Sequence, residues 1–204
     1  MTLKSLTFVY AVHSNLYINL TNRCPCNCTF CIRHNGDGAY GSDSLWLERE
    51  PTCEEVLAEF DKYDMKNIGE IVFCGYGEPM ERAEDISCIG KELKKRYPDV
   101  TIRLNTNGLG DKINGRPTAK LLEGAVDIVS ISLNSGNRED YNKVTRPKWE
   151  DSFEAMLRFA EDCKKYVPKV MFTVVDVISE REINESKAIS EKMGIPLRIR
   201  AYDT

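Results

Sequence analysis

Four cysteines fall within eight residues of this chain, in the run CPCNCTFC from Cys24 to Cys31. Cys24, Cys28 and Cys31 have the spacing Cys-x-x-x-Cys-x-x-Cys, and Phe30 precedes the last thiol. Three thiolates this close together can bind three irons of one iron–sulfur cube, and no fourth cysteine closes the set as in Cys-x-x-Cys-Pro runs. The chain must therefore fold so that these thiols meet. One iron is then left open to a small molecule that carries an amine and a carboxylate.

A structural zinc site is the alternative for this run, with Cys26 or His34 as the fourth ligand. Zinc sites usually take their thiols from two knuckles separated in the sequence, and no second pair follows here. If the run binds a cluster instead, we expect Cys26 to point away from it, and a role as an alternate ligand is the other reading. A disulfide framework is disfavoured because no segment resembles a signal peptide. The other cysteines fall in predicted helices and strands, where a free cysteine is usually a small buried residue: Cys53, Cys74, Cys88 and Cys163.

Length and charge limit the class of protein. The 204 residues are enough for one domain, spanning residues 1–204, with a single core. The balance of 28 basic and 32 acidic residues argues against a non-specific nucleic-acid surface and leaves no polybasic patch for a membrane. The longest apolar runs have the length of strands, so we expect no transmembrane helix and a cytoplasmic protein.

Strand-like and helix-like segments alternate along the chain, which predicts a parallel sheet with crossover helices. Residues 1–15 leave a hairpin and a capping strand open. Thr52 and Glu55 form a capping box at the start of a helix, and residues 89–98 and 149–166 predict two more. The predicted strands are 16–21, 70–77, 100–108, 126–136, 169–177 and 196–202.

Polar and apolar residues alternate within these strands. Ile102 and Leu104 oppose Arg103 and Asn105, and the same pattern recurs at 129–134 and 197–202. A parallel sheet covered on both faces would read as continuous apolar runs. We therefore predict an α/β fold, a partial (β/α)6 barrel with an open side, whose polar faces point inward. A polar face toward solvent on a one-sided sheet is the alternative. The glycine-rich loop 34–44 is expected to cover the cysteine run or simply to connect two elements.

The cysteine run, together with Gly75-Tyr76-Gly77-Glu78-Pro79 after the second strand, resembles the motifs of the radical S-adenosylmethionine (radical SAM) superfamily. The resemblance implies a [4Fe–4S] cluster on Cys24, Cys28 and Cys31, and SAM on the open iron. Many family members have a glycine where this chain has Tyr76, which could instead contact substrate. The likeness is greatest to TatD-linked radical SAM proteins, through LYINLTNRCPCNCTFCIR, the GDG that follows, and MGIPLRIRAY.

The resemblance also implies which residues hold SAM. The main chain at Gly77 and Glu78 would receive its amino group, Ser132 or Asn134 its ribose or carboxylate, and Arg146 is a second candidate for the carboxylate. Asp176 and the main chain from Arg200 to Tyr202 would hold ribose and adenine. The full set of expected cofactor contacts is Phe30, Tyr76, Gly77, Glu78, Asn105, Ser132, Asn134, Arg146, Asp176, Arg200 and Tyr202. No catalytic side chain is assigned.

The function that the resemblance implies is reductive cleavage of SAM to a 5′-deoxyadenosyl radical, which takes hydrogen from a small polar substrate. Arg103, Arg198 and Arg200 on inward faces favour a polar, even anionic, substrate. An external electron donor of the flavodoxin or ferredoxin type would be needed. An activase that makes a radical on a partner protein is one alternative. A non-catalytic iron–sulfur or zinc module is another.

Overall fold

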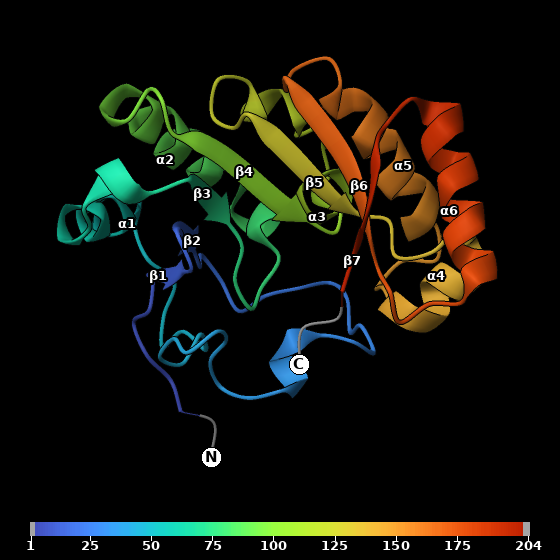
Figure 1. Cartoon of the computed structure of the whole chain (residues 1–204), viewed down its shortest axis with the longest axis horizontal. Coiled ribbons are helices and arrows are strands. Elements are labelled where there is room, and N and C mark those ends of the chain that lie inside the picture. Colours follow the sequence, from blue (N-terminus) through green and yellow to red (C-terminus); the bar gives the residue numbers. More distant parts are fainter. Residues whose placement is uncertain (1–2, 202–204) are drawn as a thin grey trace.

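A computed structural model describes residues 3–201 and contains one seven-stranded sheet in the order β1-β2-β3-β4-β5-β6-β7 (Figure 1). Strands β2 to β7 are parallel, and β1 pairs antiparallel with β2. The predicted α/β fold, a partial (β/α)6 barrel with an open side, is confirmed. The strands are β1 Val9–Val12, β2 Asn15–Ile18, β3 Glu70–Phe73, β4 Thr101–Thr106, β5 Ile128–Ser132, β6 Lys169–Val175 and β7 Leu197–Arg200.

The first two strands form a hairpin, which was one of the two alternatives for the start of the chain. Val12 pairs with Asn15, so the turn between them is only two residues long, and His13 lies in it with φ 53°. Polar residues such as histidine tolerate the left-handed region better than branched ones do, which suits such a tight turn. The hairpin covers the edge of β2 that the parallel strands leave open.

Helices connect the parallel strands and cover the outer face of the sheet, where α5 packs on β5 and α6 on β6 and β7. The predicted capping box at Thr52 and Glu55 is confirmed at the start of α1. In α5, Phe153, Met156 and Cys163 are buried as predicted. The α-helices are α1 Cys53–Glu59, α2 Ala83–Arg96, α3 Gly110–Asn114, α4 Arg138–Thr145, α5 Ser152–Cys163 and α6 Glu180–Met193, and the 3-10 turns are η1 Ile32–His34, η2 Phe60–Lys62, η3 Met65–Asn67, η4 Pro79–Arg82 and η5 Ala119–Leu122.

The hydrophobic core lies between the sheet and these helices. Ile102, Leu104 and Ile131 point to the helices and are fully buried, and each such side chain contributes about 1.5–3 kcal/mol through burial. The opposite face carries Arg103 and Asn105, as the alternation predicts. The apolar face is therefore the outer one, and the polar face lines the inside of the curved sheet.

The four remaining cysteines do not share one environment. Cys163 is buried, whereas Cys53 and Cys74 are half-buried. The prediction that all four are core residues is wrong for Cys88, which is exposed. It lies on the outer side of α2, opposite the buried Ile86 and Ile89 side.

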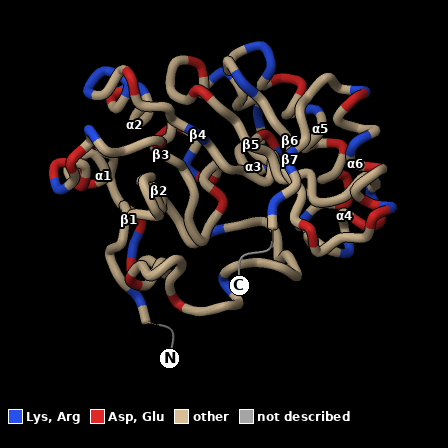
Figure 2. Tube along the Cα trace, viewed as in Figure 1, with Lys and Arg blue, Asp and Glu red and all other residues tan. Residues whose placement is uncertain are grey.

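Charged residues of both signs are interspersed over the helical side of the molecule (Figure 2). They form many surface ion pairs, such as Arg138–Glu154 and Lys165–Asp162. Within residues 3–201, no helix combines the length and apolarity needed to cross a bilayer.

Candidate active site

The cysteine run lies at the carboxyl ends of the parallel strands, where β2 ends. In Figure 1 the blue segment after β2 passes below the strand arrowheads. Backbone hydrogen bonds tie this segment to the end of α4, from Asn27 N–H to the Thr145 carbonyl (3.0 Å) and from Lys148 N–H to the Pro25 carbonyl (2.9 Å). Arg146, with φ 44°, turns the chain at this point. The loop is therefore held by the main chain of a distant helix end.

The thiols of the run line the edge of one cavity. Cys24, Cys28 and Cys31 are half-buried, and all line the cavity. The expectation that Cys26 points away is wrong, because its thiol hydrogen-bonds to Cys24 and Cys28. These bonds lower the pKa of Cys24 to about 7 and also lower the pKa of Cys28, while they raise the pKa of Cys26.

The turn after β3 packs directly against the root of the cysteine run. A Cβ at Gly77 would lie against the Thr21 carbonyl and 2.7 Å from the Arg23 carbonyl oxygen, and one at Gly75 would overlap the Asn19 side chain. Glu78 N–H donates to the Arg23 carbonyl at 2.8 Å. These glycines therefore allow one part of the chain to approach another.

The carbonyl oxygens of Gly75, Tyr76 and Gly77 accept no hydrogen bond from any group in residues 3–201. All three residues line the cavity. Successive unpaired carbonyls beside a cavity can accept the protons of an ammonium group. The turn therefore fits the amino group of a bound ligand.

Glu78 joins the ends of β3 and β4 through its buried carboxylate, which is 4% exposed. The carboxylate accepts hydrogen bonds from Thr106 Oγ1 (2.6 Å), Asn107 N–H (2.7 Å) and Met80 N–H (3.0 Å). Burial raises the pKa of Glu78 to about 8, with a further rise from Cys24, and the three donors oppose both effects. Its side chain thus fixes the turn, while its main chain faces the cysteine run.

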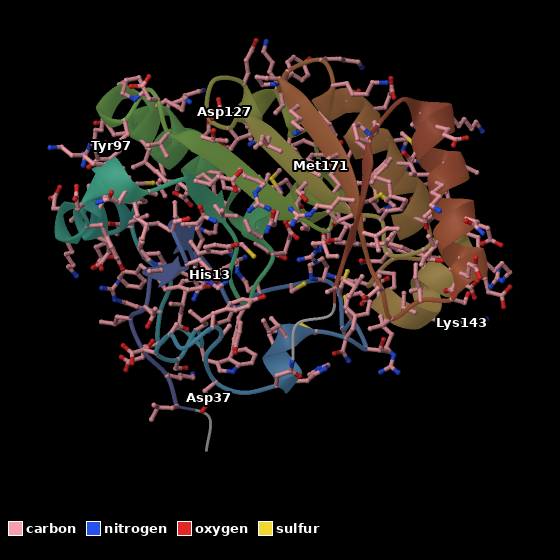
Figure 3. All side chains as sticks on the ribbon, viewed as in Figure 1. His13, Asp37, Tyr97, Asp127, Lys143 and Met171 are labelled. Atoms are coloured by element: carbon pink, nitrogen blue, oxygen red, sulfur yellow. The ribbon has the colours of Figure 1, made fainter. Side chains whose placement is uncertain are left out.

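The glycine-rich loop 34–44 lies beyond the carboxyl ends of the strands, at the opposite end of the molecule from Asp127, which precedes β5 (Figure 3). The single proton of the Tyr76 hydroxyl is shared between the carbonyls of Gly36 (2.8 Å) and Gly38 (2.9 Å). Tyr76 is 3% exposed. Its hydroxyl thus holds the loop, while Tyr76 also lines the cavity, and its expected contact with a ligand stays a prediction.

The inner face of the sheet and the cysteine run enclose a cavity of about 280 Å³. Ala39, Tyr40 and Leu45 from the glycine-rich loop and its end also line it. This arrangement favours the covering role over that of a plain connector. The structure brings together these predicted site residues: Cys24, Cys28, Phe30, Cys31, Tyr76, Gly77, Glu78, Asn105, Ser132, Asn134 and Arg200.

Three predicted residues are not brought to this cavity. Arg146 is exposed and does not line it, because its left-handed backbone at the end of α4 directs the chain back toward the cysteine run. Asp176 is also exposed and outside the lining, and its backbone N–H bonds to the Arg200 carbonyl at 2.9 Å. Tyr202 lies outside the described residues.

Sequence reasoning missed several residues of the site. Tyr10 and Tyr17 from the hairpin form one wall, with ring centroids 5.4 Å apart. Tyr17 and Asn19 alternate with apolar residues in 16–21, so an inward Tyr17 could have been found. Tyr10 has no such signal, because the sequence of residues 1–15 does not distinguish a hairpin from a capping strand. Arg33, two residues after the last cysteine of the run, donates to the Cys31 thiol.

These groups suit a [4Fe–4S] cluster with SAM on its open iron. Three thiols supply soft ligands, the unpaired carbonyls receive an ammonium, and Ser132, Asn134 and Asn105 offer polar groups to ribose and carboxylate. The combination of metal ligands and an adjoining polar cavity is suited to binding and activating a small cofactor.

Comparison with known proteins agrees with this geometry. The chain matches the model of the radical SAM superfamily over residues 18–187. Molybdenum cofactor biosynthesis protein 1 of Dictyostelium discoideum is 24% identical over 191 residues, which cover 93% of this chain and 29% of that protein. A GTP 3′,8-cyclase of Corynebacterium glutamicum (strain R) is 37% identical over 139 residues, or 65% of this chain and 34% of that protein. The chain spans about a third of the length of these relatives.

Among solved structures, Streptococcus suis SuiB bound to S-adenosylmethionine has the same fold. Its TM-score is 0.66 at 15% identity, with 94% of this chain and 43% of that chain covered. At this identity the likeness concerns the fold alone.

Proposed function

Because the chain belongs to the radical SAM superfamily, we propose that it is an enzyme that cleaves SAM and removes hydrogen from a small polar substrate held in the cavity. The cofactors of this family are a [4Fe–4S] cluster and SAM. When bound, they supply one electron and a 5′-deoxyadenosyl radical, and the electron comes from an external flavodoxin- or ferredoxin-type donor. The observation that carries the proposal is the set of half-buried thiols beside the unpaired carbonyls of Gly75 to Gly77.

The protein's own residues bind and orient the cofactors. In this proposal Cys24, Cys28 and Cys31 hold the cluster, and the carbonyls of the turn receive the amino group of SAM. Ser132, Asn134 and Asn105 hold its carboxylate and ribose, while Phe30 and the end of β7 at Arg200 contact the rest of the nucleoside. The hairpin tyrosines and loop 34–44 exclude water from the cavity.

The charges in the cavity support an anionic substrate. Arg103 is neutralised by Glu70, with 2.9 Å between Nη2 and Oε2. Arg198 and Arg200 also line the cavity, and neither forms an ion pair within residues 3–201. The names of several relatives specify GTP as their substrate, so GTP is the first anionic compound to test. The narrower resemblance to TatD-linked proteins stays a prediction.

The test is an anaerobic assay of reconstituted protein. With dithionite and SAM, the wild type should release 5′-deoxyadenosine and methionine, measured by liquid chromatography with mass detection. Adding GTP should increase this release if GTP reaches the cavity. Cys28→Ala should abolish release, because it removes a cluster ligand. Full iron content without any SAM cleavage would contradict the proposal, and stoichiometric zinc without iron would favour a non-catalytic module.

A further inference from the structure

Arg33 is folded back onto the cysteine run by the 3-10 turn η1. His34 N–H bonds to the Cys31 carbonyl at 2.9 Å, which closes the turn immediately after the last thiol. The Arg33 side chain then donates from Nε to Cys31 Sγ at 3.3 Å and from Nη2 to the Cys26 carbonyl at 3.4 Å. The Arg33 guanidinium thus contacts one predicted cluster ligand, Cys31, and the backbone between the two other predicted ligands, Cys24 and Cys28.

The charge of Arg33 is not neutralised by an acid. Among the ion pairs of residues 3–201, none involves Arg33. Its guanidinium carbon lies 5.7 Å from the centre of the Trp46 ring, and Trp46 packs edge-on against Tyr76 with centroids 5.2 Å apart. The aromatic pair fixes the guanidinium without reducing its charge. The full positive charge therefore faces the thiols.

We propose that Arg33 is a positioning residue that raises the reduction potential of the cluster by donating a hydrogen bond to the Cys31 sulfur. This inference rests on the proposed function. Reduction adds one electron, taken from the external donor, and makes the cluster more negative, while no bond breaks and Arg33 keeps its protons. A cation and an N–H donor at a ligand sulfur stabilise the more negative state, so the cluster accepts the electron more easily.

A purely structural role is the alternative, in which Arg33 only joins the loop to Trp46 and the Cys26 carbonyl. Such a role would affect folding and cluster retention but would leave the potential of a retained cluster unchanged. A measurement of the reduction potential of the cluster therefore distinguishes the two roles.

The experiment compares reconstituted wild type with Arg33→Gln, Arg33→Lys and the control Arg158→Gln. Arg158 lies on α5 and has a 64% exposed side chain, so its variant removes the same charge away from the thiols. Potentials are measured by anaerobic redox titration followed by electron paramagnetic resonance, without SAM. We expect Arg33→Gln to lower the equilibrium constant for reduction roughly tenfold, a shift of about 59 mV to more negative potential. The potential of Arg33→Lys should lie between those of the wild type and Arg33→Gln, and the potential of Arg158→Gln should match that of the wild type.

A second measurement uses the unaltered protein, in case Arg33→Gln does not retain its cluster. Wild type labelled with ¹⁵N-arginine should show a weak nitrogen coupling to the reduced cluster in pulsed electron paramagnetic resonance. An unchanged potential in a cluster-loaded Arg33→Gln, or no coupling in the labelled protein, would overturn the role of Arg33. Failure of the wild type to hold a cluster would instead overturn the proposed function, so the two failures are distinguishable.

Discussion

Cys26 lies within the cysteine run but outside the three-thiol spacing that the proposed cluster would use. It is 5% exposed and packs with the main core cluster, while its thiol hydrogen-bonds to Cys24 and Cys28. Three thiols at the family spacing are enough for a cluster with one open iron. The fourth cysteine of the run therefore has a supporting role in this proposal.

We expect Cys26→Ala to retain about four iron atoms per chain after reconstitution, since the three ligands remain. Cys28→Ala should lose most of its iron under the same conditions. Iron and sulfide analysis of anaerobic samples measures both. An equal loss of iron in the two variants would show that Cys26 is also a ligand.

Gly77 is crowded by the backbone just before the cysteine run, at Thr21 and Arg23. We expect Gly77→Ala to lower the free energy of unfolding by about 3 kcal/mol, because its Cβ would meet two backbone carbonyls that cannot move independently. Gly124→Ala is the control. Gly124 has φ +69°, but a Cβ added there would meet open space. The substitution should therefore cost about 1 kcal/mol. Urea denaturation of metal-free proteins gives both values, and equal losses would show that the turn can move away.

At the scale of elements, the glycine-rich loop 34–44 depends on a tyrosine from another element. Tyr76→Phe removes both hydrogen bonds to the loop, worth about 1–2 kcal/mol together. Amide exchange in residues 36–44 should then become roughly 5- to 30-fold faster, as measured by hydrogen–deuterium exchange with mass spectrometry. Tyr63→Phe is the matched control, because the Tyr63 hydroxyl bonds to Val9 in β1 instead. An unchanged exchange rate in residues 36–44 of the Tyr76→Phe variant would mean that other contacts hold the loop.

The start of α1 gives a prediction about pH. Hydrogen bonds from Arg49 and from the Thr52 backbone lower the pKa of Glu55 to about 2, below its ordinary value of 4.5. A carboxyl whose pKa is depressed in the folded state adds stability above the unfolded pKa, and this stability is lost as the pH falls through the folded pKa. The stability difference between wild type and Glu55→Gln should therefore be constant above about pH 5 and shrink toward pH 2. Urea denaturation across this range measures it, and a difference independent of pH would contradict the assignment.

The faces of the strands could be predicted from the sequence, because alternation decides which side of a sheet is buried. Ile102 and Leu104 face the helices, and Arg103 and Asn105 face the cavity, as predicted. Strand ends could not be predicted, since apolar alternation continues past the last ladder hydrogen bond. The strand expected to reach residue 21 stops at Ile18, where the Asn19 side chain begins to bond to the Leu45 carbonyl at 2.8 Å.

The three cysteines and the Gly-Tyr-Gly-Glu turn could be placed at one cavity because their motifs are local. Arg146 and Asp176 were misplaced because the direction of a side chain after a strand depends on the turn, here a left-handed residue in one case. The role of Tyr76 could not be found either, since its partners are backbone carbonyls about 40 residues earlier. Contacts of that kind leave no pattern in composition or periodicity.

At the scale of the molecule, the site draws on residues from Tyr10 in the first strand to Arg200 in the last strand. A ligand that binds all of these elements stabilises the whole fold. We expect SAM at about a hundredfold its Kd to add about 2.7 kcal/mol to the unfolding free energy of cluster-loaded protein. The midpoint of thermal unfolding should rise by about 5–10 °C. Anaerobic thermal melts test this, with Cys28→Ala expected to show no rise, and an equal rise in that variant would place SAM elsewhere.

The contact between Gly77 and the carbonyls of Thr21 and Arg23, with the Glu78 N–H bond to Arg23, makes two distant stretches of chain into one rigid template. The distance from the proposed cluster ligands to the carbonyls proposed to accept the ammonium group is then set when the sheet forms. The conformational entropy that must be lost to fix that distance is lost during folding. A small molecule that binds later therefore does not have to order these groups.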